Sequence, residues 1–440
     1  MPDRLRSGQE YSTLEAPDLL AVAAAGRSVP TFYWERPSEG LAMLGLGTAW
    51  EMRASGSGRF TEASRAAIAA LHDSTPCGDR AFGPFAVGGF GFSDAECGDR
   101  AWREFPSLRW WIPELLWVRR GAECRLTRTR RSDASGGADD RLREALAAST
   151  RRAMAAAPRT ALRALPTAGE KRRWAARVEE ISKRIAANEL DKVVLARRRT
   201  MHTRAPLDAA AMLAAARTRR PTCTSFCIHA GETSFFGSTP ERLVALDGGR
   251  FRSGALAGTA PRSRDRAEDD RLGAALLACA KNRREHDLVV EAVRAALAPV
   301  AESLAVADRP TLVRLPEAQH LSTPISGRLA GDATVLELAT RLHPTPAVCG
   351  VPREAARLVI EQQEPGRGWF TGAVGWMAPD GSGELAVALR SVLIDGRDAT
   401  VWAGAGIVRG SSAETELAET ESKMNALFES LGADDDERAA

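Results

Sequence analysis

A chain of 440 residues is long enough for one large domain or for two to three ordinary ones. A hydrophobic content of 44% and a charged content of 27% are ordinary for a globular protein with a substantial core. The 60 basic and 57 acidic residues leave a net charge of +3, so no overall field favours nucleic acid or a membrane surface. Basic clusters such as 197–199 lack interleaved aromatic residues, and we interpret them as solvated faces.

The seven cysteines are an odd number and show no Cys-x-x-Cys spacing. Cys223 and Cys227 lie four residues apart, but no second pair completes a zinc pattern. We therefore expect reduced thiols in a cytoplasmic protein. The first ten residues are polar, which argues against a signal peptide, and the apolar run 19–26 is too short to span a bilayer.

The first part of the chain, to about residue 145, is predicted to be rich in β-strands. Strands are expected in four stretches, the third of them a glycine-rich pair: 31–34, 41–50, 82–92 and 108–119. A helix is expected at 60–72. A polar loop at 132–140 and an alanine-rich helix at 141–157 follow, and 158–169 is the best candidate for a linker.

Beyond the linker, four apolar residues recur at the spacing of a helix that docks on a core: Trp174, Val178, Ile181 and Ile185. The next strand opens with Lys192. A lysine at the start of a buried strand is costly unless it is paired or functional, and in a desolvated site it can lose its proton and act as a base. The alternative is a lysine that snorkels at the strand edge.

A hairpin is predicted between 224 and 237, and Glu241 follows directly after Pro240 at a junction of strand and turn. Glu241 is either functional, a surface glutamate or a partner of Arg242. Residues 256–262 form a second glycine turn after a strand.

A single long helix is predicted over 274–297, with Glu285 in its middle. Further on, 342–347 is a proline-locked loop that presents His343. The stretches 368–376 and 384–394 are predicted to form a hairpin.

The second strand of that hairpin carries Arg390. A buried arginine needs an anion as its partner, so Arg390 is a candidate for binding a carboxylate.

Residues 403–408 are predicted to be a glycine-rich loop that opens an acidic helix. Glycine lets backbone N–H groups approach a ligand closely, and a helix N-terminus favours an anion. Glu416 and Glu419 share one face of the helix, and they would repel that anion unless a cation such as Mg²⁺ lies between. The alternative is a solvated charged helix after a tight turn.

Roughly residues 170–432 resemble the chorismate-utilising enzymes. The resemblance is carried by a dense series of motifs in order: Lys192-Val-Val-Leu-Ala-Arg, Phe236-Gly-Ser-Thr-Pro-Glu-Arg-Leu, Leu256-Ala-Gly-Thr-Ala-Pro-Arg, Glu285-His286, Gln319-His-Leu, Leu342-His-Pro-Thr-Pro-Ala, Leu389-Arg-Ser, Ala403-Gly-Ala-Gly-Ile-Val and Glu419-Thr-Glu-Ser-Lys423. Within that family the chain is most similar to isochorismate synthases. Lys192 stands where ammonia-adding members generally carry Gln, and Ala257 where aminodeoxychorismate synthases carry Lys.

This resemblance implies an α+β fold with two large antiparallel sheets packed face to face and helices outside. Residues 1–165 would be an N-terminal β-rich region packed into the same fold, and 166–432 the chorismate-binding catalytic region. The acidic stretch 433–440 is expected to be a disordered tail.

The resemblance also implies an isomerase that converts chorismate to isochorismate, by adding water at C2 and releasing the C4 hydroxyl. Lys192 would be the general base and Glu241 the general acid. Mg²⁺ would hold the ring carboxylate, with Glu285 and Glu419 as ligands and Glu416 close by.

By the same resemblance, Arg390 would pair with the enolpyruvyl carboxylate. Further substrate contacts are implied for six residues: Gly404, Ala405 and Gly406 through backbone N–H groups, Lys423 through its charge, and Thr259 and His343 beside the ring. Phe370 departs from the family, since many members carry there a Tyr whose hydroxyl contacts the enolpyruvyl carboxylate.

Three alternatives stay open. A salicylate synthase, which also eliminates pyruvate from isochorismate, shares almost all of these residues. A non-catalytic homologue would bind chorismate-like ligands without turnover. An amine-forming enzyme is disfavoured by Lys192 and by the absence of a glutaminase segment, so no glutaminase subunit is expected. Menaquinone, siderophore and other secondary metabolism remain open as pathways, and a monomer is expected.

Overall fold

The computed structural model describes seven segments of the chain: residues 5–11, 18–25, 29–73, 79–131, 162–164, 169–203 and 206–430. The loop predicted at 132–140, the helix at 141–157, most of the linker at 158–169 and the tail at 433–440 lie outside these segments. In the described part of the chain, no helix is both long enough and apolar enough to span a bilayer. The six cysteines described are free thiols.

The described strands form two sheets, and all of their pairings are antiparallel. The larger, 12-stranded sheet contains β1 (Leu5–Tyr11), β2 (Thr31–Arg36), β3 (Leu41–Leu46), β7 (Leu115–Arg120), β8 (Glu123–Arg131), β9 (Leu162–Ala164), β10 (Lys192–Thr203), β11 (Thr224–Ala230), β12 (Thr233–Thr239), β18 (Gly350–Val351), β21 (Ser391–Asp395) and β22 (Asp398–Val408). Their order is β1-β8-β7-β3-β2-β11-β12-β21-β22-β10-β18, with β9 beside β10.

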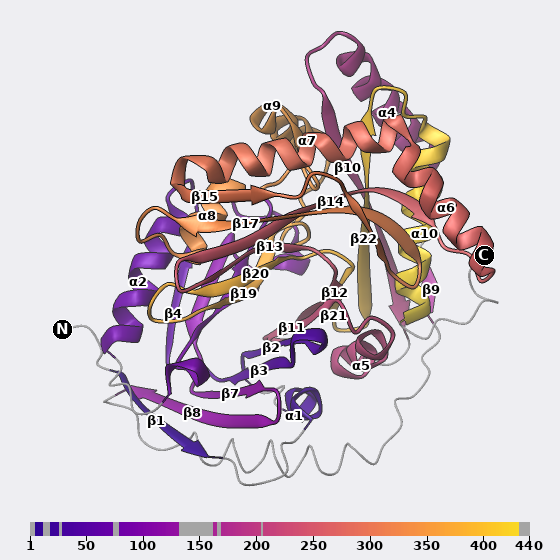
Figure 1. Ribbon diagram of the computed structural model, residues 1–440. Coiled ribbons are helices and arrows are strands. Elements are labelled where there is room, and N and C mark those ends of the chain that lie inside the picture. The colour runs from indigo at the N-terminus through magenta and orange to yellow at the C-terminus, as the bar shows by residue number, and fades with distance from the viewer. Residues whose placement is uncertain are drawn as a thin grey trace.

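The smaller, 10-stranded sheet contains β4 (Trp50–Ala54), β5 (Ala86–Phe90), β6 (Leu108–Ile112), β13 (Arg242–Asp247), β14 (Arg250–Pro261), β15 (Ala301–Val306), β16 (Thr311–Arg314), β17 (Ala318–Leu329), β19 (Ala373–Met377) and β20 (Gly383–Val387). Their order is β15-β17-β14-β13-β20-β19-β5-β6-β4, with β16 beside β17. Both sheets therefore mix strands from before residue 165 with later ones, as the colours of Figure 1 show.

Aromatic side chains from both sheets are buried together between them, among them Trp34 on β2, Trp111 on β6, Trp376 on β19 and Trp402 on β22. The alternation along β2 explains how the sheets acquire an inner and an outer face. Phe32 and Trp34 belong to the core between the sheets, whereas Tyr33 belongs to a separate core beneath helices. The predicted fold, two large antiparallel sheets packed face to face, is confirmed.

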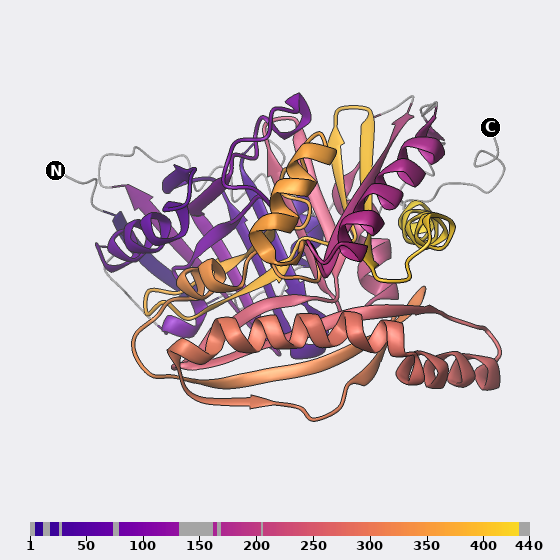
Figure 2. The same ribbon diagram turned by 90° about the horizontal axis from the view of Figure 1, so that it is seen from above.

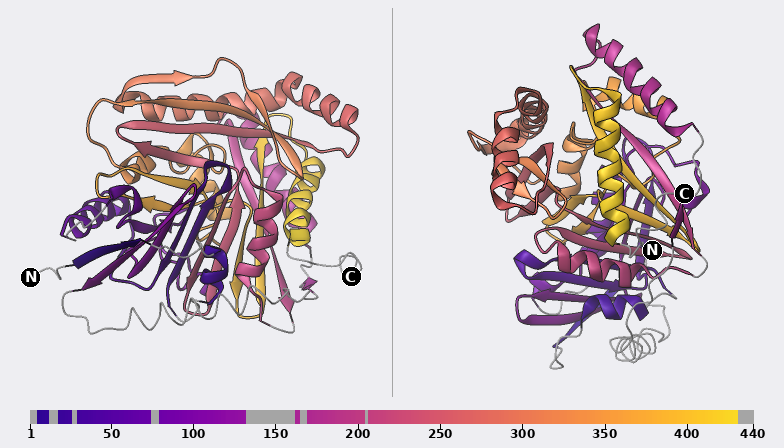
Figure 3. Two further views of the ribbon diagram at one scale, coloured as in Figure 1. Left: turned by 60° about the horizontal axis from the view of Figure 1, so that its bottom comes forward. Right: turned by 90° about the vertical axis from the view of Figure 1, so that its right-hand side faces the viewer.

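Helices cover the outer faces, and their bounds are α1 (Leu19–Ala25), α2 (Arg59–Asp73), α4 (Glu170–Ala186), α5 (Ala209–Arg219), α6 (Arg266–Ala278), α7 (Ala280–Leu297), α8 (Val335–Leu342), α9 (Arg353–Gln363) and α10 (Ala413–Ser430). Helices α1, α5 and α10 pack on the 12-stranded sheet, and α2, α7 and α8 on the 10-stranded one. Helices α4 and α9 cover β10 and β22. Figure 2 shows α6 and α7 in succession along one side of the molecule, and Figure 3 shows the yellow α10 beside β22.

Two predicted strands are each divided between the sheets. The stretch 41–50 becomes β3 in the larger sheet and the start of β4 in the smaller one. Similarly, 108–119 becomes β6 and β7, with Pro113 at the break. The apolar pattern predicted extended chain correctly. It could not show the change of sheet, because the sequence of a strand that is buried on both faces does not reveal to which of two sheets the strand belongs.

The predicted long helix over 274–297 is also divided. Helix α6 ends at Ala278 and α7 begins at Ala280, with Cys279 between them in extended conformation. Glu285 therefore lies near the start of α7 and not in the middle of one long helix.

Candidate active site

The site lies where two neighbouring segments of the chain each cross from one sheet to the other. One passage joins β12 to β13 through Pro240 and Glu241, and the other joins β20 to β21 through Arg390. The two passages are hydrogen-bonded to each other, since Val387 N donates to Glu241 O at 3.0 Å and Ser238 N donates to Arg390 O at 3.3 Å. They therefore hold the Glu241 and Arg390 side chains at one place between the sheets.

Arg390 was predicted inside a single apolar strand over 384–394. The structure instead places it at the corner between two strands of different sheets, with a left-handed φ of 49°. Such a conformation is unfavourable for a residue with a side chain, and the surrounding hydrogen bonds must hold it in place. A strained backbone at a buried, charged residue is typical of a functional site.

A pocket opens at these two passages. Eight of the predicted site residues line it: Glu241, Thr259, Glu285, Arg390, Gly404, Gly406, Glu419 and Lys423. The lining also includes residues to which the sequence assigned no role, among them His320, Arg367, Thr371, Leu389 and Trp402. The pocket combines an apolar wall with a small number of convergent charges, which is the usual character of a small-molecule site.

Lys192 lies just behind the pocket wall and is fully buried at the start of β10. Its ammonium donates to Glu285 Oε1 at 2.9 Å. Gly406 on the neighbouring strand makes room for this pair, because a Cβ built there would lie 2.5 Å from Glu285 Oε1 and 3.1 Å from Lys192 Cε. The Lys192 side chain therefore meets the pocket wall from behind, at the point where Glu285 and Gly406 line it.

Glu241 is the most perturbed carboxyl of the pocket. Only 6% of its surface is exposed. Burial raises the pKa of the Glu241 carboxyl to about 8, although the nearby charge of Lys192 acts in the opposite direction. Glu241 is therefore protonated at neutral pH and can donate a proton.

The predicted glycine loop at 403–408 is not a loop. These residues lie inside β22, where Gly404 pairs with Ala196 and Gly406 with Val194 of β10. Strand β21 pairs with β22 only as far as Val401, so within the described residues this end of β22 has β10 as its partner strand.

The side chains along β22 also alternate, which separates the three residues predicted to contact substrate. Gly404 and Gly406 line the pocket, whereas Ala405 points into the core beneath α4 and α9.

Helix α10 brings further charges to the pocket, as its sequence predicted. The Lys423 ammonium pairs with Glu419 and donates to Gly404 O at 2.8 Å. Glu416, one turn earlier, instead accepts from Lys281 of α7 at 2.8 Å and does not line the pocket.

The donor chemistry fits Mg²⁺ in part. Glu285 and Glu419 offer two pocket-lining carboxylates, and Mg²⁺ characteristically takes one or two carboxylates, several waters and oxygens of a substrate. Among the described residues, no three His, Cys, Asp or Glu side chains gather closely enough to hold a metal ion. Each of the two carboxylates is held by a lysine in this structure, so a metal would have to replace that lysine as their cation.

His320 and Glu317 surround Arg390. The Arg390 Nη1 group is ion-paired with Glu317, and its Nη2 lies 3.4 Å from His320 Nε2. His320 Nδ1 lies 3.3 Å from Gly258 O and 3.2 Å from Thr259 Oγ1. Burial, with the charges of Arg390 and Lys423, lowers the pKa of His320 to about 3. The ring is therefore neutral, and its Nδ1–H can donate to Gly258 O while Nε2 accepts from Arg390.

The sequence predicted no role for Glu317. It comes three residues before His320, in the turn between β16 and β17, and its neighbours in the sequence do not distinguish it from a surface glutamate.

His343 was expected beside the substrate ring, but the structure places it elsewhere. Its Nε2 donates to Phe92 O at 3.1 Å, and its ring packs edge-on against Phe90 and Phe60. Burial lowers the pKa of His343 to about 3, which is consistent with a neutral histidine in an apolar core. His343 is not among the described residues that line the pocket.

Phe370 does line the pocket and is 1% exposed. Its ring stacks on Trp402 with centroids 5.7 Å apart and an interplanar angle of 17°. The aromatic shape is thus kept at this position, but the wall offers no hydroxyl donor here.

Comparison with known proteins identifies several relatives. A family model described as "Chorismate binding enzyme" matches residues 6–432. The chain is 36% identical over 416 residues to a salicylate biosynthesis isochorismate synthase of Pseudomonas aeruginosa, covering 92% of this chain and 86% of the relative. It is 33% identical over 414 residues to isochorismate synthase MenF of Bacillus subtilis, covering 91% and 88%.

Among solved structures, the fold is similar to that of MenF, the menaquinone-specific isochorismate synthase from Escherichia coli. The TM-score is 0.80 at 31% identity, and the match covers 98% of this chain and 95% of that one. The likeness therefore includes the strands that come before residue 165.

Proposed function

The chain belongs to the family of chorismate binding enzymes, and from this premise we propose that it is an isochorismate synthase. The reaction is an isomerisation in which water adds at C2 of chorismate, the ring double bond shifts, and the C4 hydroxyl leaves as water. The observation that carries the proposal is the protonated, buried Glu241 in a pocket whose wall includes Glu285, the partner of Lys192.

Glu241 is the general acid in this proposal. A hydroxyl is a poor leaving group, and a carboxylic acid that still holds its proton at neutral pH can protonate it as the C–O bond breaks. The pKa of about 8 keeps Glu241 in the required form without making the acid too weak to donate.

Lys192 is the general base, and it takes the proton from the attacking water. In the structure its ammonium is engaged by Glu285 at 2.9 Å. Lys192 can accept a proton only as the free amine, so Glu285 must turn to another partner before the reaction. Lysine suits this role because its amine can be stabilised in a desolvated site.

Arg390 and Lys423 bind the two carboxylates of chorismate. The planar guanidinium of Arg390 matches a carboxylate in a two-point contact, and we assign it to the enolpyruvyl group. We assign the ring carboxylate to Lys423 and to backbone N–H groups at Gly404 and Gly406, all of which line the pocket. Mg²⁺ held by Glu285 and Glu419 would supply the positive charge that a carboxylate needs beside these two acidic side chains.

The proposal is tested by incubating the protein with chorismate and Mg²⁺ and separating the products. We expect isochorismate to form without pyruvate, and we expect Lys192→Ala to lower kcat by about 10²- to 10⁴-fold, the range for losing an acid–base group. Salicylate released together with pyruvate would instead identify a salicylate synthase. Equal background rates for wild type and Lys192→Ala would contradict an enzymatic role and favour a binding protein.

A further inference from the structure

We propose that Glu317 and Arg220 are positioning residues that fix the guanidinium of Arg390 for the substrate's carboxylate, an inference that rests on the function proposed above. Neither residue is in the described lining of the pocket. They therefore act on the substrate through Arg390.

The geometry forms a chain of three charges. Glu317 Oε1 accepts from Arg390 Nη1, and Glu317 Oε2 accepts from Arg220 Nε at 3.3 Å. One carboxylate thus joins two arginines, and each of the three side chains is at most 11% exposed. Charge-assisted contacts in so dry an environment are stronger and more directional than they are at a surface.

Two restraints together set the plane of the Arg390 guanidinium. Glu317 holds Nη1, and the neutral His320 ring accepts from Nη2 at 3.4 Å. A guanidinium has five N–H donors, so these two contacts leave three for a ligand. Arg390 is therefore oriented by the protein and still has donors for a carboxylate in the pocket.

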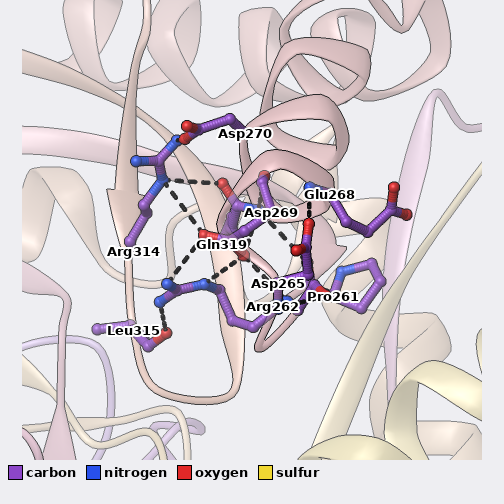
Figure 4. A network of polar contacts seen from close by, with 10 residues as sticks. Pro261, Arg262, Asp265, Glu268, Asp269, Asp270, Arg314, Leu315 and Gln319 are labelled. Carbon is purple, nitrogen blue, oxygen red and sulfur yellow. Dashed lines mark hydrogen bonds and ion pairs between the residues drawn. The ribbon is translucent and has the colours of Figure 1, made fainter.

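Glu317 is itself held rigidly, because the turn that carries it is anchored to α6. Gln319, the second residue of β17, donates to Asp269 O at 2.9 Å, and Arg262 clamps both oxygens of Asp269 at 2.8 and 2.9 Å. Arg262 also donates to Leu315 O, at the base of the turn. Figure 4 shows these side chains converging between α6 and the β16–β17 hairpin.

The charges of the cluster match a monoanionic ligand group. Arg220 and Arg390 contribute two positive charges and Glu317 one negative charge, so one carboxylate of the substrate brings the cluster to neutrality. Arg220 is 4% exposed, and its Nη1 has no hydrogen-bond partner. Burying an arginine with an unsatisfied donor weakens the fold, so the arrangement is better explained by a requirement of the site than by stability.

The test is a double-mutant cycle on chorismate turnover with Glu317→Gln and Arg220→Met. Glu317→Gln keeps the side-chain shape and removes its charge, so KM should rise about tenfold, as when one charge-assisted hydrogen bond is weakened, with kcat nearly unchanged. Arg220→Met should raise KM less, and in the Glu317→Gln background it should have no further effect. Arg220→Lys, which keeps the charge, should restore part of the loss.

Glu302→Gln is the matched control, because Glu302 pairs with Arg328 on the same sheet at 3.3 Å but both side chains are more than half exposed. It should leave KM unchanged. An unchanged KM in Glu317→Gln, or effects of the two substitutions that multiply in the double variant, would overturn the proposal. Melting temperatures identify any variant whose loss is one of folding.

Calorimetry gives the dissociation constant of chorismate, and it therefore tests the roles of Glu317 and Arg220 without turnover. A wild type that forms no isochorismate would contradict the proposed function, and the ratio of the dissociation constants of wild type and Glu317→Gln would still decide the role of Glu317. A ratio near one would reject it.

Discussion

Glu241 in the pocket and Asp269 in the network beneath α6 are almost equally buried, with 6% and 5% of their surfaces exposed. Their carboxyls are nevertheless in opposite states. Burial raises the pKa of Glu241 to about 8, whereas the hydrogen bond from Arg262 lowers the pKa of Asp269 below its ordinary value. Glu241 keeps its proton at neutral pH and Asp269 does not.

The difference lies in how completely each region satisfies its own charges. Around Asp269, the donors of Arg262 and Gln319 are used within the protein, so that region holds the hairpin rigidly in place. Around the pocket, Lys192 and Arg390 are each held by one carboxylate and can change or add partners. Two carboxyls with similar exposed fractions thus belong to a structural network in one case and to the candidate active site in the other.

Replacing the acid should give the largest change in activity. Glu241→Gln preserves the shape of the side chain but cannot donate an acidic proton, so we expect kcat to fall by about 10²- to 10⁴-fold. In the wild type, kcat/KM should decline as the pH rises through about 8, because Glu241 loses its proton there. A variant that retains wild-type kcat would show that Glu241 is not the acid.

The same residue should also affect stability. The pKa of Glu241 is about 8 in the folded state, against an ordinary value of 4.5. Its contribution to stability is therefore fully present below pH 4.5 and is lost as the pH rises toward 8. Denaturant unfolding should show Glu241→Gln gaining stability relative to wild type between pH 5 and pH 8.

Filling the space beside the Lys192–Glu285 pair should have the next largest effect. The Cβ of Gly406→Ala would lie 2.5 Å from Glu285 Oε1, so the pair must move. Displacing a reacting group by about 1 Å can lower kcat on the order of 10²-fold. Gly254→Ala is the control, since its Cβ would meet the nearest atom at 3.2 Å and Gly254 is not among the described residues that line the pocket. Equal kcat for both variants would contradict this role of Gly406.

Restoring a hydroxyl at the pocket wall should have a smaller effect. Phe370→Tyr adds one donor to a ring that already stacks on Trp402. We expect KM for chorismate to fall by about tenfold, the lower end of the range for one hydrogen bond to a charged group. Steady-state kinetics measure this directly. A raised KM would mean that the hydroxyl has no carboxylate to bind at this wall.

Asp269→Asn should change kcat least and stability most clearly. The variant loses the charge that Arg262 clamps, so its melting temperature at neutral pH should fall by several degrees while kcat at lower temperature stays near the wild-type value. Because the pKa of Asp269 is lowered in the fold, this loss should shrink as the pH falls below 3.8. A fall in kcat with unchanged melting temperature would mean that the Asp269 network acts on the chemical step and not only on the fold.

Much of the fold could be predicted from local patterns. The helix at 170–186, the hairpin of β11 and β12 and the strand opened by Lys192 follow from periodicity and turn residues. The patterns failed where the chain changes sheet, as in 41–50, 108–119 and 384–394, because alternation reports burial and not the identity of the neighbouring strand.

The sequence by itself determined which residues are candidates for the chemistry: a lysine, a glutamate after Pro240, a buried arginine and the acidic face of α10. Tertiary structure alone decided how they are paired. It placed Lys192 against Glu285, gave Arg390 the partner Glu317, turned Ala405 into the core and placed His343 among phenylalanines. The physical reason is that protonation and partner choice depend on burial and on contacts between segments far apart in the chain, which local sequence does not record.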